Sequence, residues 1–424
     1  MKRISFILVV SIALAIASGF TLWETDKPEN TLSGANVMAF GPDNVLFVGD
    51  SKEGKILAIP TEAVKVEDPI PYNFLDFDLK LAEALNMEVR DIIIQDMKVH
   101  PLSQEVYVAV RMGHAPDAPY SVAIVNPMSN EISLLESASA DVTEVSIKNP
   151  ASEELVFWRD KPGSMLNITD IDYYDGNIYV AGIQNTEFAS TLRKITYPFL
   201  GEQEVVGSIE VYHAIHTQNE TRAPIRTMLI TELEGEPTLL ASYTCTPLVT
   251  IPLAEIKDGN KITGNTIAEL GYGNTPVDMI SYMNQEDDGS TDQKLLVTHK
   301  HRSGGLISMK DVVSASKGEG LAGKTGLSGV PEGIPIYPLP TSTIIQVDNQ
   351  NQMMIAALKR NLDTGGLDLV SELKGPYLRL SEFISEYDFP EYKYGEGQEY
   401  TQQFHDMIKP MEGYPDLTSD KNKE

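Results

Sequence analysis

The chain has 424 residues, a formal net charge of −28 and 42% hydrophobic residues. A surface this acidic repels phosphate backbones and anionic lipid headgroups, which argues against nucleic acid or a membrane surface as a partner. Cys245 is the only cysteine, which excludes an intramolecular disulfide, so the folded body must depend on its hydrophobic core.

The N-terminus has the pattern of a secretory signal. Lys2 and Arg3 precede an apolar run over residues 4–16, and the small residues Ala15 and Ala17 form a cleavage site. The run is shorter than the roughly 20 residues that span a membrane, although an uncleaved anchor is the alternative interpretation. We therefore predict a signal peptide over residues 1–17, cleaved after Ala17. The mature protein is expected to be monomeric and periplasmic or extracellular, with a net charge of −30 and no stable membrane insertion.

Six segments of the chain share one sequence pattern. Each has an apolar strand, a short turn rich in Asp, Asn or Gly, a second strand, a polar loop and a third strand. The segments are Val37–Ile59, Asp96–Val125, Ile168–Ile195, Ile225–Leu253, Val277–Met309 and Thr343–Val370. Their second strands are anchored at Val45, Val106, Ile178, Leu239, Leu295 and Met353, at intervals of 61, 72, 61, 56 and 58 residues. Such near-constant spacing is typical of a β-propeller whose repeats carry long loops.

A fourth strand fits in the gaps between the segments, over residues 73–79, 132–135, 205–212, 266–270, 334–339 and 377–383. The sequence therefore predicts an all-β fold: one propeller of six four-stranded blades over residues 18–390, followed by a partly disordered extension over residues 391–424. A seventh blade has room only around residues 142–158, and two sandwich domains are the alternative all-β architecture. Helices are expected only over residues 74–85 and 401–411.

Two strand-turn-strand stretches carry a resemblance to known repeats. FGPDNVLFVGDSKEGKILAI over residues 40–59 and YYDGNIYVAG over residues 173–182 resemble the core of NHL-type and gluconolactonase-like propeller repeats. Other strings, such as ASYTCTPLV, are similar to exported bacterial propeller proteins without an assigned activity. The resemblance implies the propeller fold. Metal-dependent propeller lactonases carry an early Glu beside Gly-Pro, and this chain has Ala39 and Phe40 before its Gly-Pro, which puts lactonase chemistry in doubt.

Polar residues begin or follow the inner strands of the predicted blades, where we expect them to converge at one mouth of a central channel. This predicted ligand site consists of Asn36, Asp96, Asp170, Arg226 and Asp278 at strand-one starts, with Arg111 at a strand-two exit. Structural pairing of the carboxylates with Arg226 is one explanation. The other is a divalent cation such as calcium, because oxygen ligands from separate blades can surround a hard ion.

A second group of candidate ligands has softer atoms. Cys245 and His299 follow equivalent strands of neighbouring predicted blades, and His301 and His114 lie at similar exits. Thiolate and imidazole ligands favour copper or zinc. Cys245 acting as a nucleophile with a histidine base is a further alternative. His213 and His216, in the string VYHAIH, are interpreted as loop or edge residues.

The leading functional hypothesis is a non-enzymatic exported binding protein that presents its channel mouth to a protein, peptide or carbohydrate partner. The alternative is a metal-dependent hydrolase or oxidoreductase with its metal at the same face. The sequence leaves open whether the protein is an enzyme, because a propeller fold by itself implies no activity.

Overall fold

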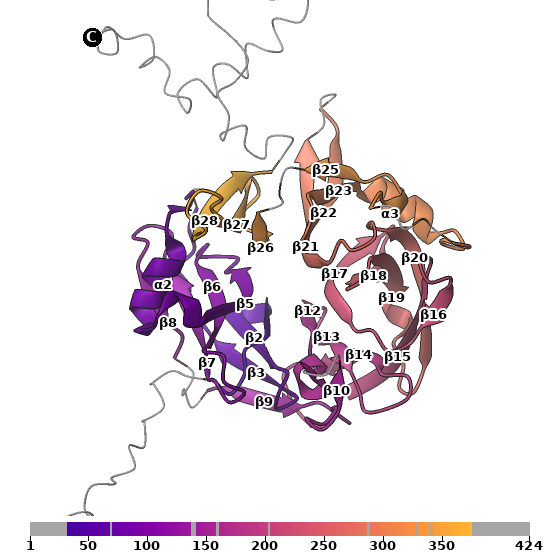
Figure 1. Cartoon of the computed structure of the whole chain (residues 1–424), viewed down its shortest axis with the longest axis horizontal. Coiled ribbons are helices and arrows are strands. Elements are labelled where there is room, and N and C mark those ends of the chain that lie inside the picture. Colours follow the sequence, from indigo (N-terminus) through magenta and orange to yellow (C-terminus); the bar gives the residue numbers. More distant parts are fainter. Residues whose placement is uncertain are drawn as a thin grey trace, which may run out of the picture.

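The computed structural model describes residues 32–374, except 68–69, 137–140, 158–160, 202–203, 286–288, 325, 327–328, 340 and 342. The predicted signal peptide, the extension over residues 391–424, the strand over residues 377–383 and the helix over residues 401–411 lie outside this part. The predicted all-β, propeller-like class is confirmed, because small antiparallel sheets are arranged radially around a common centre (Figure 1). Within the described part, no helix is long and apolar enough to cross a membrane.

The first third of the chain forms two four-stranded sheets. One consists of β1 (Val37–Phe40), β2 (Val45–Asp50), β3 (Lys55–Pro60) and β9 (Thr143–Ser146). The other consists of β5 (Ile92–Val99), β6 (Val106–Met112), β7 (Tyr120–Val125) and β8 (Ile132–Leu134). In its described residues, the stretch with room for a seventh blade contributes β9 and β10 (Val156–Phe157), and β10 pairs with β11 (Lys161–Pro162).

The middle of the chain forms two groups of four strands that are joined into one sheet. The first group is β12 (Asp170–Tyr174), β13 (Asn177–Ile183), β14 (Ser190–Thr196) and β15 (Glu204–His213). The second group is β17 (Ile225–Leu233), β18 (Glu236–Tyr243), β19 (Pro247–Pro252) and β20 (Lys261–Glu269). Their outer strands β15 and β20 pair in parallel, whereas pairing within each group is antiparallel. Two short strands, β16 (Gln218–Glu220) and β24 (Glu332–Gly333), extend this sheet.

The last two sheets also have four strands each. One contains β21 (Pro276–Gln285), β22 (Thr291–His299), β23 (Gly304–Ser308) and β25 (Tyr337–Leu339). The other contains β26 (Ile344–Asn349), β27 (Met354–Arg360), β28 (Leu367–Leu373) and the early strand β4 (Asn73–Phe74). In the described residues the helices are α2 (Phe77–Leu85), α3 (Met309–Ser316) and the 3-10 turns Pro42–Asn44, Val89–Asp91, Gly163–Leu166 and Leu253–Glu255. Because α3 is a helix, the expectation of helices only over residues 74–85 and 401–411 was wrong.

The inner strands contact one another in a closed cycle that runs β1, β12, β17, β21, β26, β5 and back to β1. This order differs from the order of the chain, because the sheet of β5 lies between the sheets of β26 and β1 (Figure 1). The chain builds the β1 sheet, crosses to pair β4 with β28, and then forms the β5 sheet. It later returns so that β9 can pair with β3. Of the strand predicted over residues 73–79 for the first blade, only β4 forms, and it completes the last sheet instead. Residues 77–85 form the helix α2, in agreement with the helix expected over residues 74–85.

The second strand of each sheet is buried on both faces because neighbouring sheets cover it. In β2, for example, every residue from Val45 to Asp50 is buried. Six hydrophobic clusters each fill the space between two adjacent sheets of the cycle. Tyr107 and Leu46 belong to the cluster between the sheets of β5 and β1. Burial against both neighbours explains why these strands read as continuous apolar runs rather than as alternating patterns.

Tight turns close the hairpins where the sequence supplies residues that tolerate positive φ. Asp175 and Gly176 connect β12 to β13 with φ values of 44° and 76°, and Glu234 and Gly235 connect β17 to β18 with 51° and 85°. Two consecutive positive φ angles are the signature of a hairpin turn whose twist matches that of its strands. Asp-Gly in YYDGNIYV was therefore a correct signal for this turn.

Candidate functional site

Acidic residues line the inner strands near the centre of the ring. Asp96 on β5 and Asp278 on β21 each follow a β-bulge, and Asp170 and Asp172 lie on β12, with Asp348 on β26. A bulge bends a strand and re-aims the side chains beside it. Together with Lys98 of β5, these residues form what we call the axial cluster: Asp96, Lys98, Asp170, Asp172, Asp278 and Asp348.

Each carboxylate of the axial cluster accepts a hydrogen bond from the inner strand of the neighbouring sheet. The pairs are Met38 N–H to Asp96 Oδ2 (2.6 Å), Met228 N–H to Asp170 Oδ2 (2.6 Å), Ile230 N–H to Asp172 Oδ2 (2.7 Å), Val347 N–H to Asp278 Oδ2 (3.1 Å) and Val99 N–H to Asp348 Oδ2 (2.8 Å). In every pair, the strand that carries the aspartate comes directly before the strand that carries the N–H in the order β1, β12, β17, β21, β26, β5 and back to β1. The other oxygen of each accepts the N–H of the following residue. These carboxylates therefore join adjacent sheets.

Lys98 supplies the cation of the axial cluster. Its Nζ lies 3.7 Å from Asp96 Oδ1 and 3.9 Å from Asp278 Oδ1, and its side chain is 19% exposed. Burial by itself lowers the pKa of Lys98, but the charges of Asp278 and Asp96 outweigh burial and hold the pKa well above its usual value. Lys98 was not a candidate in the sequence analysis. In the sequence it occupies a polar position of a strand in which apolar and polar residues alternate, which is typical of an exposed side chain.

Burial acts in the opposite sense on the carboxylates that Lys98 cannot fully neutralise. Burial raises the pKa of Asp170 to about 8, partly offset by Lys98. It raises the pKa values of Asp172 and Asp278 to about 6. One lysine cannot neutralise several carboxylates that lie close together in a low-dielectric space. The protonated form is therefore favoured in some of these carboxyl groups.

The other residues predicted at the channel mouth do not join this cluster. Arg226 is the extra residue at a bulge of β17 and its side chain is exposed, so the cation beside Asp278 is Lys98 rather than Arg226. Asn36 accepts a hydrogen bond from the Ser51 N–H. Arg111 donates to the carbonyl oxygen of Ala115. A β-bulge rotates a side chain out of its expected direction, which explains the position of Arg226.

A second polar cluster lies at the outer junction where β15 and β20 run in parallel. His213 ends β15, His216 lies in the following turn, and Cys245 lies in the connection from β18 to β19. One ligand atom from each of these residues lies within 4.8 Å of the others. We call these three residues the Cys–His cluster. His213 is completely buried, whereas Cys245 and His216 are accessible to solvent.

Two carboxylates support the Cys–His cluster. Glu220 Oε1 lies 3.1 Å from His213 Nδ1 and 2.5 Å from His216 Nδ1. Glu269 is buried and accepts hydrogen bonds from the Ala214 N–H (2.9 Å) and the Thr246 hydroxyl (2.5 Å). Because Ala214 follows His213 and Thr246 follows Cys245, Glu269 fixes the two chain segments that carry these ligands. Glu220 therefore positions the two imidazoles, and Glu269 positions the backbone beside His213 and Cys245.

The soft-ligand group predicted from the sequence thus has different members in the structure. Cys245 and His299 do follow the second strands of neighbouring sheets, as expected. His299 is buried with Nδ1 3.1 Å from the Ser303 carbonyl oxygen, and His114 Nε2 contacts the Arg90 carbonyl oxygen. His301 is exposed, and none of these three histidines shares the group with Cys245. The sequence signal that was missed is His-Ala-Ile-His directly after a long strand, where a turn brings both imidazoles to one place.

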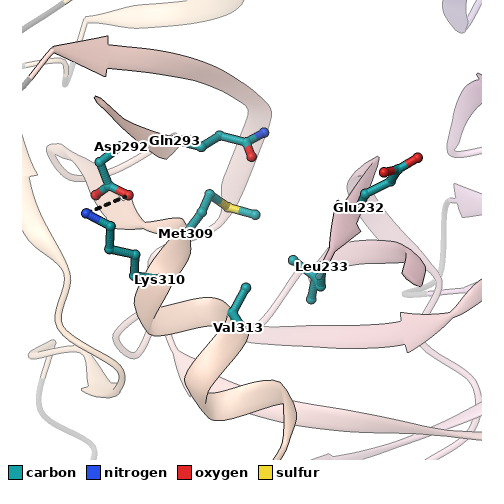
Figure 2. A pocket seen from close by; sticks show the side chains of 7 residues that line it. All are labelled: Glu232, Leu233, Asp292, Gln293, Met309, Lys310 and Val313. Atoms are coloured by element: carbon teal, nitrogen blue, oxygen red, sulfur yellow. Dashed lines mark ion pairs between the residues drawn. The ribbon is translucent and has the colours of Figure 1, made fainter. Parts of the chain in front are cut away.

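Two adjoining cavities form a groove beside α3. One, of about 300 Å³, lies between the β17 and β21 sheets, and Figure 2 shows Leu233, Met309 and Val313 around it with the ion pair of Asp292 and Lys310 at one side. The other, of about 310 Å³, shares Leu233 and Val313 and continues over β18, β19 and β20. We call this pair of cavities the α3 groove.

Comparisons with known proteins give no family assignment. No family model matches the chain, and no curated protein matches it either. Among solved structures, Drosophila semaphorin 1b, extracellular domains 1–2, is 9% identical, with 82% of this chain and 86% of that chain covered and a TM-score of 0.34. Drosophila plexin A in complex with semaphorin 1b is 9% identical, with 82% of this chain and 87% of that chain covered and a TM-score of 0.35. BBS1N in complex with ARL6DN is 10% identical, with 77% of this chain and 73% of that chain covered and a TM-score of 0.28. At these TM-scores the likeness carries no argument about ligand or activity.

Proposed function

We propose that the protein is an exported, six-bladed β-propeller that binds an extended peptide bearing apolar and basic side chains in the α3 groove. The closed cycle of inner strands and the hydrophobic cluster between each adjacent pair of sheets support six blades. The signal-like sequence before Ala17 supports export.

The composition of the α3 groove is the observation that carries the proposed ligand. Leu233, Met309 and Val313 give it an apolar floor. Its rim carries four acidic residues and two basic ones: Glu232, Glu234, Glu236, Asp292, Lys310 and Lys317. Both lysines already have acidic neighbours, because Lys317 lies 2.7 Å from Glu234 and Lys310 lies 3.7 Å from Asp292. Asp292 also pairs with Lys294 at 2.9 Å. The negative charge of Glu232 and Glu236 suits a basic ligand.

The axial cluster is less suited to ligand binding because its carboxylates already have partners. Asp96, Asp170 and Asp278, which the sequence placed at a channel mouth, use their oxygens to accept backbone N–H groups. A ligand at this place would have to compete with bonds that join adjacent sheets. This use of the carboxylates favours a binding scaffold over the alternative of a hydrolase or oxidoreductase with its metal at the channel mouth.

Fluorescence anisotropy with labelled ten-residue peptides tests the proposal. Peptides that alternate Leu and Arg should bind, and peptides of equal length that alternate Leu and Glu should not. Charge reversal at the groove, in Glu232→Lys and Glu236→Lys, should weaken binding at least about fivefold, because like charges then face each other. Glu62→Lys, an exposed reversal in the loop after β3, is the control. Equal binding of both peptides, or no binding of either, would contradict the proposed ligand.

A further inference from the structure

The Cys–His cluster has the residues of a transition-metal site that is independent of the α3 groove. We propose that His213, His216 and Cys245 bind one Zn²⁺ ion, with Glu220 as the carboxylate that orients the two imidazoles. The ligand atoms converge, one buried nitrogen among them is unsatisfied, and carboxylates surround the cluster.

The ligand atoms are already close to the separation that an ion requires. Zn–N bonds of about 2.0–2.1 Å and a Zn–S bond of about 2.3 Å in a tetrahedron place ligand atoms roughly 3.3–3.8 Å apart. The three ligand atoms of the cluster lie within 4.8 Å of one another. His216 and Cys245 are on connections between strands, where small side-chain movements can bring their ligand atoms onto an ion. Little rearrangement is needed.

An unsatisfied imidazole nitrogen gives independent support. His213 is 0% exposed and its side chain interacts with that of Cys245, but among the described residues its Nε2 hydrogen-bonds to no nitrogen or oxygen, with the Glu269 carboxylate at 3.8 Å. Most buried polar atoms in folded proteins are hydrogen-bonded, and an unsatisfied one requires an explanation such as a bound ion. The buried carboxylates of the axial cluster, by contrast, all have backbone donors. Zinc binding would account for the buried imidazole of His213.

Glu220 has the position expected of the carboxylate in a metal site. It contacts Nδ1 of both His213 and His216 through the same oxygen. Imidazoles that bind metal generally donate their other N–H to a carboxylate, which orients the ring. Glu220 can perform this role at both rings, which leaves Nε2 of each ring to face the ion. Its loss should therefore weaken the site.

The chemistry of the donor set selects the metal. One thiolate and two imidazoles match a borderline ion such as Zn²⁺, whereas Ca²⁺ and Mg²⁺ prefer sites built only from oxygen. An ion at this location should also affect stability, because His213 ends β15 and β15 pairs in parallel with β20. An ion that holds His213 to Cys245 would tie this strand to the connection between β18 and β19, so zinc should raise the melting temperature.

The test uses the full chain without a polyhistidine tag, because a tag binds the same ions. After dialysis against a chelator, isothermal titration with ZnCl₂ should give one ion per chain. His216→Gln and Cys245→Ser should each weaken binding at least tenfold, and Glu220→Gln about 10- to 100-fold. His301→Gln, an exposed histidine outside the cluster, is the matched control and should bind as the wild type does.

Cobalt substitution provides a second readout that does not depend on the affinity of any variant. Co²⁺ bound by the wild-type protein should show a thiolate-to-metal charge-transfer absorption, and this band should disappear in Cys245→Ser. CaCl₂ at the same concentration should not displace Zn²⁺. Absence of zinc binding, unchanged affinity in both His216→Gln and Cys245→Ser, or displacement by Ca²⁺ would overturn the assignment. Peptide binding in the α3 groove is measured separately, so the two proposals fail independently.

Discussion

The axial cluster and the Cys–His cluster are both polar groups in a mostly apolar fold, but they differ in how their atoms are satisfied. In the axial cluster every carboxylate accepts a backbone hydrogen bond from the adjacent sheet, and Lys98 provides a cation. In the Cys–His cluster a buried imidazole nitrogen of His213 hydrogen-bonds to no nitrogen or oxygen of the described residues. The comparison teaches that burial and charge alone do not distinguish a structural polar group from a ligand site, whereas unsatisfied hydrogen-bonding capacity beside converging ligand atoms does.

The largest expected effect is on stability, when the cation of the axial cluster is removed. Lys98→Met should lower the free energy of unfolding by about 3–5 kcal/mol at pH 7, because it leaves buried carboxylates without their counter-charge. Urea denaturation measures this loss. Lys80→Met, on the exposed face of α2, should change the free energy by less than about 0.5 kcal/mol. Equal stability of the two variants would show that the axial carboxylates do not need Lys98.

A smaller effect separates Asp278 from Arg226, which the sequence suggested as partners. Asp278→Ala should cost about 1.5–3 kcal/mol, because it removes a carboxylate that accepts the Val347 N–H between adjacent sheets. Arg226→Ala should change stability by less than about 0.5 kcal/mol, because the side chain is exposed at a bulge. If the two variants proved equally destabilised, the result would contradict this account and support the pairing of Asp278 with Arg226 that the sequence suggested.

The axial cluster should also make stability depend on pH. The pKa of Asp170 is raised by burial to about 8, and those of Asp172 and Asp278 to about 6. A carboxyl group whose pKa is higher in the folded state contributes stability that is lost as pH rises from its unfolded pKa, about 4, to its folded pKa. The melting temperature should therefore fall from about pH 4 to pH 8, with Asp172 and Asp278 contributing below about pH 6 and, of these three, Asp170 alone between pH 6 and pH 8. Asp170→Asn, which stays neutral, should flatten this fall in thermal scans, and an unchanged slope would remove Asp170 from the account.

The smallest expected effect on stability is at the Cys–His cluster. In metal-free protein, Cys245→Ser should change the free energy of unfolding by less than about 0.5 kcal/mol, because the residue is partly exposed and serves mainly as a ligand. Added ZnCl₂ should then raise the melting temperature of the wild type but not that of Cys245→Ser. A large loss of stability in the metal-free variant would indicate that Cys245 is a packing residue instead.

Much of the fold could be predicted from local patterns in the sequence. Alternating and continuous apolar runs with Asp-Gly turns located most strands, including β13 and β18. The order of the sheets could not be predicted, because the pairing of β4 with β28 and of β9 with β3 joins segments that are far apart in the chain. Strand periodicity does not specify which distant edge a short strand will pair with.

The candidate sites show the same limit. The sequence singled out Asp96, Asp170 and Asp278 as polar residues at the starts of inner strands, but their acceptor role depends on the N–H groups of neighbouring sheets. Cys245 was identified as a ligand candidate, yet its neighbours His213 and His216 come from the adjacent four-strand group. These two histidines reach Cys245 because β15 is long and runs in parallel with β20, a pairing that residue spacing does not reveal.

The contrast between the two clusters is tested most directly by measuring unfolding free energy and zinc affinity in the same two variants. Asp278→Ala should lose about 1.5–3 kcal/mol of stability and still bind one Zn²⁺ with the affinity of the wild type. Cys245→Ser should keep the stability of the metal-free wild type and bind Zn²⁺ at least tenfold more weakly. If Asp278→Ala lost zinc binding while remaining folded, or if Cys245→Ser kept it, the assignment of separate structural and metal-binding roles would be contradicted.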